Sequence, residues 1–120
     1  MRRGRGATLL PVALALLPTV ALAHASLVKS APARRAVLNH PPARVELWFN
    51  ERLEPAYSSL SVTDASGARV DRGDVTIDPE DPRRLRVSLP ALGPGRYTVR
   101  FRVLSVDGHV VESAFPFSVK

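Results

Sequence analysis

The 120-residue chain has 17 Lys and Arg against 11 Asp and Glu, a formal net charge of +6, and length enough for one domain. The absence of cysteine excludes both a disulfide-stabilised fold and a metal site built from thiolates. The arginines are spread among acidic residues rather than packed into basic blocks with aromatics, which argues against nucleic-acid binding.

The first 23 residues have the three-part layout of a secretory signal peptide. Three arginines occur within the first five positions, residues 7–21 are almost uninterruptedly apolar, and Ala21-Leu22-Ala23 resembles a cleavage site. We therefore predict export and a mature domain of residues 24–120, with 14 basic and 11 acidic residues, a net charge of about +3 and no membrane anchor.

An uncleaved N-terminal membrane anchor is the alternative to a signal peptide. Pro11 and Pro18 lie inside the apolar run, and they disfavour a long helix that spans a bilayer. Sec export is expected rather than twin-arginine export, because the residues around the arginine pair fit the twin-arginine signal poorly.

The remaining chain has the pattern of short strands separated by turns. Apolar residues alternate with polar ones in several runs, and no segment keeps a helical period beyond two turns. The expected strands are 44–51, 59–63, 84–89, 95–103 and 114–119, with 70–77 as an edge strand or irregular connection. A single helical turn is expected at 33–38, a hairpin-type turn at 64–67, a solvated loop at 78–82, and a turn at 90–95.

About seven strands with a turn signal every 8–12 residues or so predict an all-β fold. We expect an immunoglobulin-like Greek-key β-sandwich whose aromatic residues lie at its centre. Without cysteines, the disulfide that joins the two sheets of antibody domains is absent.

Cleavage after Ala23 would make His24 the first residue of the mature chain. A free N-terminal histidine offers its α-amine and imidazole Nδ1, which together close a six-membered chelate ring on one metal ion. An internal histidine cannot do this, because its backbone nitrogen is an amide. Both groups lose their protons readily near neutral pH when a metal competes for them.

A second candidate element is Ser105-Val106-Asp107-Gly108-His109. In an extended chain Asp107 and His109 project to the same side, and Gly108 allows the backbone to bend so that both converge on one point. Two imidazoles, an amine and a carboxylate suit the tetragonal preference of Cu(II) and are less natural for Ca²⁺ or Mg²⁺. Taken alone, the motif is more typical of a plain turn capped by its aspartate; a histidine at the mature N-terminus and the lack of Cys and Met in the mature chain favour the metal site instead.

These features resemble the CopC (YobA-like) family of small periplasmic copper-binding proteins over essentially the whole mature chain. The resemblance is carried by His24-Ala-Ser-Leu27, Val45-Glu-Leu-Trp-Phe-Asn-Glu51, the Asp-Gly-His motif and Phe115-Pro-Phe-Ser-Val119. It implies a periplasmic Cu(II) carrier or buffer in copper homeostasis or resistance, with one Cu(II) per chain. It also implies transfer to a membrane transporter of the CopD type.

The resemblance assigns the metal ligands to His24, Asp107 and His109. Glu51 corresponds to an acidic residue of the family that lies close to the metal, as a weak ligand or a neighbour of the ligands. Some members carry a methionine-rich loop for Cu(I); here the only methionine is Met1, so no Cu(I) site is expected.

Two further residues have ordinary structural interpretations. His40, in Leu38-Asn-His-Pro-Pro42, fits neither kind of copper site and is expected to be an exposed turn residue. Trp48 could lie beside the site, but core packing or an edge position is the more common role.

Two other functions stay open at this stage. An N-terminal histidine on a β-sandwich is also similar to the histidine brace of copper-dependent oxidative enzymes. An Asp ligand and a mature chain of 97 residues fit poorly with their open copper face and broad substrate platform, so no enzyme activity is expected. The other alternative is a metal-free immunoglobulin-like interaction module.

Overall fold

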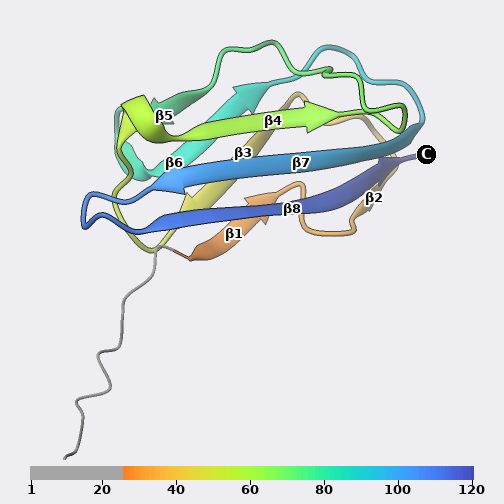
Figure 1. Ribbon diagram of the computed structural model, residues 1–120. Coiled ribbons are helices and arrows are strands. Elements are labelled where there is room, and N and C mark those ends of the chain that lie inside the picture. Colours follow the sequence, from red (N-terminus) through yellow and green to blue (C-terminus); the bar gives the residue numbers. More distant parts are fainter. Residues whose placement is uncertain (1–25) are drawn as a thin grey trace, which may run out of the picture.

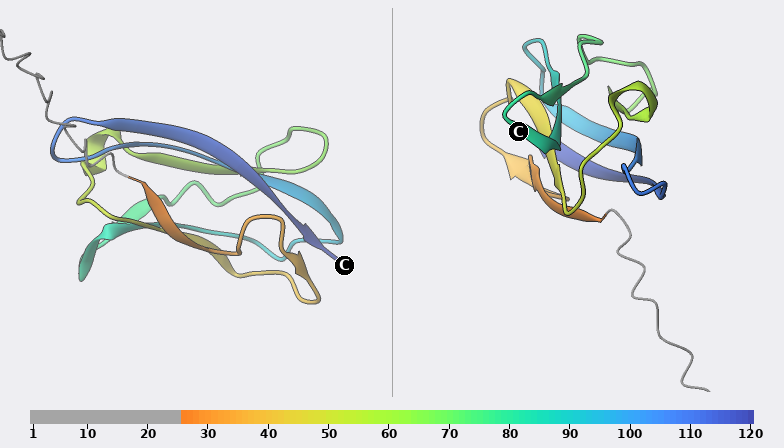
Figure 2. Two further views of the ribbon diagram at one scale, coloured as in Figure 1. Left: turned by 90° about the horizontal axis from the view of Figure 1, so that it is seen from below. Right: turned by 90° about the vertical axis from the view of Figure 1, so that its left-hand side faces the viewer.

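The computed structural model describes residues 26–120, which form two four-stranded sheets packed face to face (Figures 1 and 2). The first sheet, called sheet A, contains β1 (Leu27–Ala31), β3 (Arg44–Phe49), β6 (Asp81–Ser88) and β5 (Thr76–Asp78), in that order. Sheet B contains β2 (Val37–Leu38), β8 (Val110–Val119), β7 (Gly95–Leu104) and β4 (Ser59–Thr63). One short 3₁₀ helix, η1 (Pro55–Tyr57), lies between β3 and β4.

The strand order confirms the immunoglobulin-like sandwich. The order β1-β3-β6-β5 facing β8-β7-β4 is that of the ABED and CFG sheets of an immunoglobulin domain, and β2 is an additional short strand parallel to β8. The hydroxyl of Tyr97, near the start of β7, donates to the carbonyl oxygen of Gly93 at 2.7 Å. This contact is of the tyrosine-corner type found in such sandwiches.

The core lies between the sheets and contains the residues that alternation predicted. Val45, Leu47 and Phe49 of β3 are all buried, and so are the inward residues of β4, β6, β7 and β8. Phe49 meets Phe101 edge to face with ring centroids 5.5 Å apart, and Tyr97 stacks on Phe117 at 5.4 Å. The first contact joins the two sheets across the core, and the second joins the neighbouring strands β7 and β8 within sheet B.

Two local predictions are wrong. Residues 33–38 form no helical turn: Ala36 N–H donates to the Ala33 carbonyl in a turn, and β2 follows at once. The solvated loop expected at 78–82 is a tight turn between β5 and β6, because Asp78 is buried and paired with Arg84 while Glu80 N–H caps its carboxylate. The weak stretch at 70–77 ends in β5, the edge strand of sheet A, as expected.

Trp48 lies neither in the core nor at the edge of the sheet. It is half-buried on the outer face of sheet A, with Lys29 Nζ 4.7 Å and Arg84 Cζ 5.7 Å from its ring centroid. Both cations lie at distances typical of cation–π contacts. Within residues 26–120 no helix is long and apolar enough to cross a membrane.

Candidate metal centre

The Asp-Gly-His motif forms the turn between β7 and β8. The Gly108 N–H donates to the Ser105 carbonyl and the Ser105 N–H donates to the His109 carbonyl, both at 2.9 Å. Gly108 has φ 92°, a left-handed conformation that a side chain would disfavour, which explains why glycine occupies this point. The turn brings Asp107 Oδ1 to 3.1 Å from His109 Nδ1, so the carboxylate and the imidazole converge as the spacing predicts.

Ser105 holds this pair in position from beneath. Its side chain is buried, its hydroxyl donates to Asp107 Oδ1, and its oxygen accepts the His109 N–H at 3.2 Å. The sequence pattern includes Ser105 in the motif, but the predicted ligand set gives it no role. The signal was present, because a serine two residues before an aspartate in a turn is placed to bond its carboxylate.

The charge of Asp107 is stabilised by its neighbours. The hydrogen bond from the Ser105 hydroxyl, followed by that from His109, lowers the pKa of the Asp107 carboxyl below its usual value. Both side chains are about one-third exposed, at 37% for Asp107 and 31% for His109. A charged carboxylate and an imidazole that are both accessible to solvent are donors of the kinds that nitrogen–oxygen metal sites use.

The segment after β3 joins this turn to the start of the described chain. Asn50 N–H donates to the Ser26 carbonyl at 3.1 Å, and Ser26 N–H donates to Asn50 Oδ1 at 2.7 Å. Two residues further on, the Arg52 carbonyl accepts the Val106 N–H at 2.9 Å. The beginning of β1 and the β7–β8 turn therefore lie at the same end of the sandwich (Figures 1 and 2).

The other candidate ligands are placed as follows. Glu51 is half-buried in this connecting segment but does not form a three-ligand group with Asp107 and His109. His40 is exposed in the β2–β3 loop, as expected, at the end of the sandwich opposite the β7–β8 turn. The predicted signal peptide, its predicted cleavage site and His24 lie outside the described residues.

Asp107 and His109 need further ligands to hold a metal ion. Across residues 26–120, no three His, Cys, Asp or Glu side chains gather closely enough to do so. A site at this turn would be completed from outside that range or by solvent. The residues present fit one side of a Cu(II) site and do not complete one.

The fold and the site together define a class of protein: a two-sheet immunoglobulin-like sandwich in which an aspartate and a histidine converge at one end. The CopC domain family model matches residues 27–120, and the chain belongs to this family. It is accordingly a copper-handling protein.

Among the proteins similar to the chain are two solved structures and one curated relative. The crystal structure of CopC from Methylosinus trichosporium OB3b has a TM-score of 0.75 and 40% identity, and covers 81% of this chain and 94% of that one. PcoC, a methionine-rich copper resistance protein from Escherichia coli, has a TM-score of 0.71 and 27% identity over 82% of this chain and 100% of that one. The copper transport protein CutJ of Bacillus subtilis (strain 168) is 34% identical over 99% of this chain, which spans only 22% of the length of CutJ.

Proposed function

We propose that the protein is an exported, periplasmic carrier or buffer of Cu(II) that binds one ion per chain at the β7–β8 end of the sandwich. The ligands in this proposal are the α-amine and imidazole of His24, the carboxylate of Asp107 and the imidazole of His109. The observation that carries it is the convergence of Asp107 and His109, 3.1 Å apart, at the end of the sandwich where the described chain begins.

The reach of the chain supports the participation of His24. Ser26 is fixed against Asn50 by two hydrogen bonds, and a connection of two residues spans at most about 7 Å. The segment from Asn50 to Arg52 in turn contacts the β7–β8 turn through Val106. Glu51 lies in that segment, where it would serve as a weak ligand or as a hydrogen-bond acceptor for a ligand.

The oxidation state follows from the donors. An amine, imidazoles and a carboxylate favour Cu(II), whereas thioether and thiolate sulfur favour Cu(I). PcoC is described as methionine-rich, but this chain has no cysteine and its only methionine is Met1. We therefore propose a protein without a Cu(I) site.

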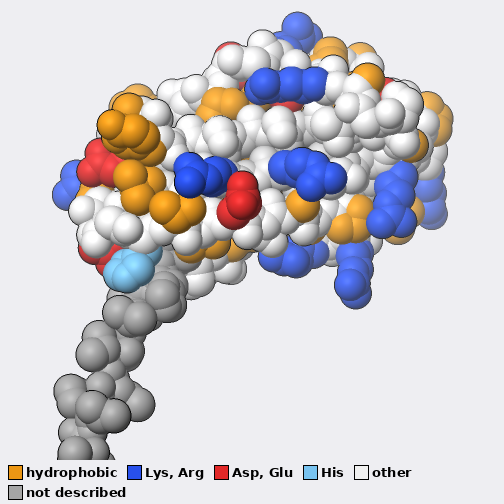
Figure 3. All heavy atoms as spheres, in the orientation of Figure 1, with side chains coloured by type: hydrophobic (Ala, Val, Ile, Leu, Met, Phe, Trp, Pro, Cys, Tyr) orange, Lys and Arg blue, Asp and Glu red, His pale blue; other side chains and the backbone are white. Residues whose placement is uncertain are grey.

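Delivery to a membrane copper transporter of the CopD type is the second part of the proposal. CutJ carries a similar domain within a much longer copper transport protein. Exposed apolar side chains flank the proposed ligands in this chain: Val106 is 52% exposed and Val110 is 50% exposed. Figure 3 shows hydrophobic side chains gathered at this end of the molecule, where a protein partner would meet the copper site.

Cu(II) titration of the exported protein, followed by electron paramagnetic resonance, tests this function. Asp107→Ala and His109→Ala should each weaken binding strongly, because each removes a ligand, and the spectrum of any remaining complex should change. His40→Ala is the matched control and should leave affinity and spectrum unchanged. Equal effects of all three substitutions, or no tight Cu(II) binding by the wild-type protein, would refute the proposal.

A further inference from the structure

The outer face of sheet B carries a row of arginines on a floor of small residues. Arg96, Arg100 and Arg102 of β7 alternate with buried residues and are exposed on this face. Their partners on the neighbouring strands are mostly short: Ser59 and Ser61 on β4, and Ala114 and Ser118 on β8. The arginine side chains therefore project from a surface made mainly of short, uncharged side chains.

These arginines are largely unneutralised, unlike those of the opposite face. Glu112 is the one acidic residue in the four strands of sheet B, and its carboxylate lies 3.9 Å from Arg102. On the outer face of sheet A, by contrast, arginines of β3 and β6 are paired with the carboxylates of Glu46 and Asp78. The arginines on the outer face of sheet A are thus mostly paired with carboxylates, whereas Arg96 and Arg100 of sheet B have no acidic cross-strand partner within the strands of their sheet.

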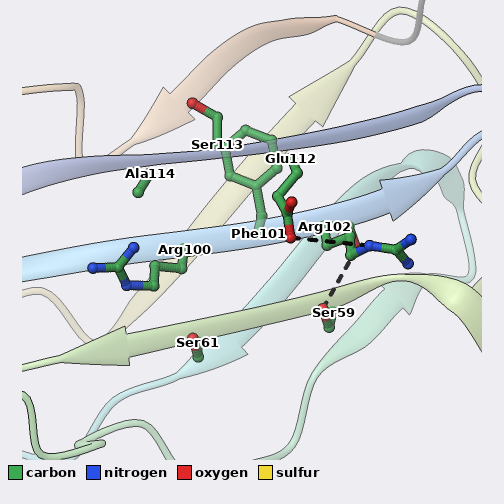
Figure 4. Close-up of a pocket in the computed structure, with 8 residues that line it drawn as sticks. All are labelled: Ser59, Ser61, Arg100, Phe101, Arg102, Glu112, Ser113 and Ala114. Atoms are coloured by element: carbon green, nitrogen blue, oxygen red, sulfur yellow. Dashed lines mark hydrogen bonds and ion pairs between the residues drawn. The ribbon is translucent and has the colours of Figure 1, made fainter.

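A shallow cavity of about 440 Å³ opens between the arginines of β7 (Figure 4). Ser61 and Ala114 contribute to its lining, and the side chains of Arg100 and Arg102 point away from one another on either side. The hollow is lined by serines, by the two arginines and by Glu112, whose carboxylate lies beside Arg102. Serine hydroxyls and guanidinium groups bind the oxygen atoms of phosphate.

Two further arginines extend the basic surface beyond β8. Arg34 and Arg35 lie in the turn between β1 and β2, which Arg35 N–H fixes to the Pro116 carbonyl at 2.7 Å. Both line a second hollow, together with Ala114 and Pro116. Figure 3 shows Lys and Arg side chains spread across this side of the molecule with few acidic ones between them.

We propose that this face, defined by Arg34, Arg35, Arg96, Arg100 and Arg102, binds the surface of an anionic phospholipid bilayer. From Arg96 to Arg102 the extended chain covers roughly 20 Å, so the guanidinium groups cannot converge on one phosphate. A spread, flat array of cations instead matches a flat array of lipid phosphates, and juxtamembrane arginines bind such surfaces electrostatically. Lipid headgroups and other phosphate compounds offer the same phosphate oxygens to these arginines, but the spread of the arginines over a flat face favours a lipid surface as the ligand.

The position of the basic face also bears on the proposed copper site. Strand β7 runs along the basic face and ends at the turn that carries Asp107 and His109. A domain lying on the bilayer through this face would hold that turn at the rim of the contact. A membrane-embedded partner could then reach the turn by lateral diffusion.

Co-sedimentation with vesicles tests the inference, with the exported protein after its N-terminus has been verified. Binding is expected to vesicles of phosphatidylcholine with phosphatidylglycerol at low salt, and not to phosphatidylcholine alone. It should weaken as salt rises, because exposed charges are screened. The variant Arg96→Gln/Arg100→Gln should lower the partition coefficient by about 30-fold.

The matched control is Arg72→Gln/Arg83→Gln. It removes the same charge from two exposed arginines that lie outside the proposed face: Arg83 is in β6 of sheet A, and Arg72 is in the connection between β4 and β5. This control should retain most of the binding. Equal losses in the two variants would show that net charge alone acts, and no binding to anionic vesicles at low salt would overturn the proposal.

A duplex DNA of random sequence and free inorganic phosphate complete the test. The lipid assignment is wrong if DNA or phosphate binds the wild-type protein as tightly as the anionic vesicles do, and if the Arg96→Gln/Arg100→Gln variant loses that binding and vesicle binding to the same extent. The face would then be a general anion-binding surface. Cu(II) affinity should be the same for both double variants, so failure of this inference is distinguishable from failure of the copper proposal.

Discussion

Replacement of the buried hydroxyl beneath the proposed metal ligands is the most informative perturbation of this site. Ser105 is 1% exposed, donates to the Asp107 carboxylate and accepts the His109 N–H. Ser105→Ala removes the acceptor that this N–H uses in the interior of the turn. Loss of such a partner lowers the free energy of unfolding by about 1–3 kcal/mol, which urea unfolding of the metal-free protein would measure.

The same substitution should weaken copper binding without removing a ligand. Asp107 loses the hydrogen bond that orients its carboxylate, and removing such a supporting contact costs about 10–100-fold in metal affinity. Competition with a Cu(II) chelator measures this loss. Ser59→Ala, at an exposed serine of β4, is the control and should change stability by less than about 0.5 kcal/mol.

The two readouts separate a structural role from a role at the metal. If Ser105→Ala lowers stability but binds Cu(II) as tightly as Ser59→Ala does, the orientation of Asp107 by Ser105 does not matter to the metal. The reasoning that joins this hydrogen bond to copper binding would then be refuted. Loss of both stability and affinity is the result we predict.

Two other substitutions test the account of the fold. Phe117→Ala removes a fully buried ring that stacks on Tyr97. The free energy of unfolding, measured in urea at neutral pH, should fall by about 3–5 kcal/mol. A loss below about 1 kcal/mol would contradict the packing described for this ring. Burial raises the pKa of Asp71, but hydrogen bonds from Arg69 and from backbone N–H groups outweigh it, so the folded pKa lies below its usual value. The resulting stability is present above about pH 4 and is lost as pH falls through the lower folded pKa. Asp71→Asn should therefore show a shallower acid dependence than the wild-type protein in unfolding series, and parallel curves would count against this contribution.

The central strands could be predicted from sequence because each buries one face. Residues such as Val45, Leu47 and Phe49 alternate with polar neighbours, and this pattern allows only one face of the strand to point inward. β1 was missed for the complementary reason: it is an edge strand with little buried surface, so its sequence lacks alternation. Its place is set by pairing with β3, a long-range contact that local patterns do not encode.

The error at Asp78 has a similar origin. Acidic residues between prolines are typical of a solvated loop, but Asp78 is buried against Arg84 from the facing strand. The strand register puts Asp78 opposite Asp81 beside a register shift, and only the three-dimensional structure shows that Arg84 reaches its carboxylate. Charged residues at an edge can thus be structural when cross-strand cations neutralise them.

The candidate site was partly predictable. The spacing of Asp107 and His109 around a glycine predicted their convergence, and the turn confirms it. The contribution of Ser105 and the link from Ser26 through Asn50 to the turn depend on hydrogen bonds between distant segments. The metal-binding roles of His24, Glu51, Asp107 and His109 stay predictions.

The free N-terminal amine is the central claim of the copper proposal, and one measurement tests it most directly. Cu(II) affinity should be compared between the exported protein beginning at His24 and a variant with one alanine before it. The extra residue turns the His24 nitrogen into an amide and moves the amine away from the chelate, so we predict a large loss of affinity and an altered electron paramagnetic resonance spectrum. Equal affinity and identical spectra for the two proteins would contradict the account.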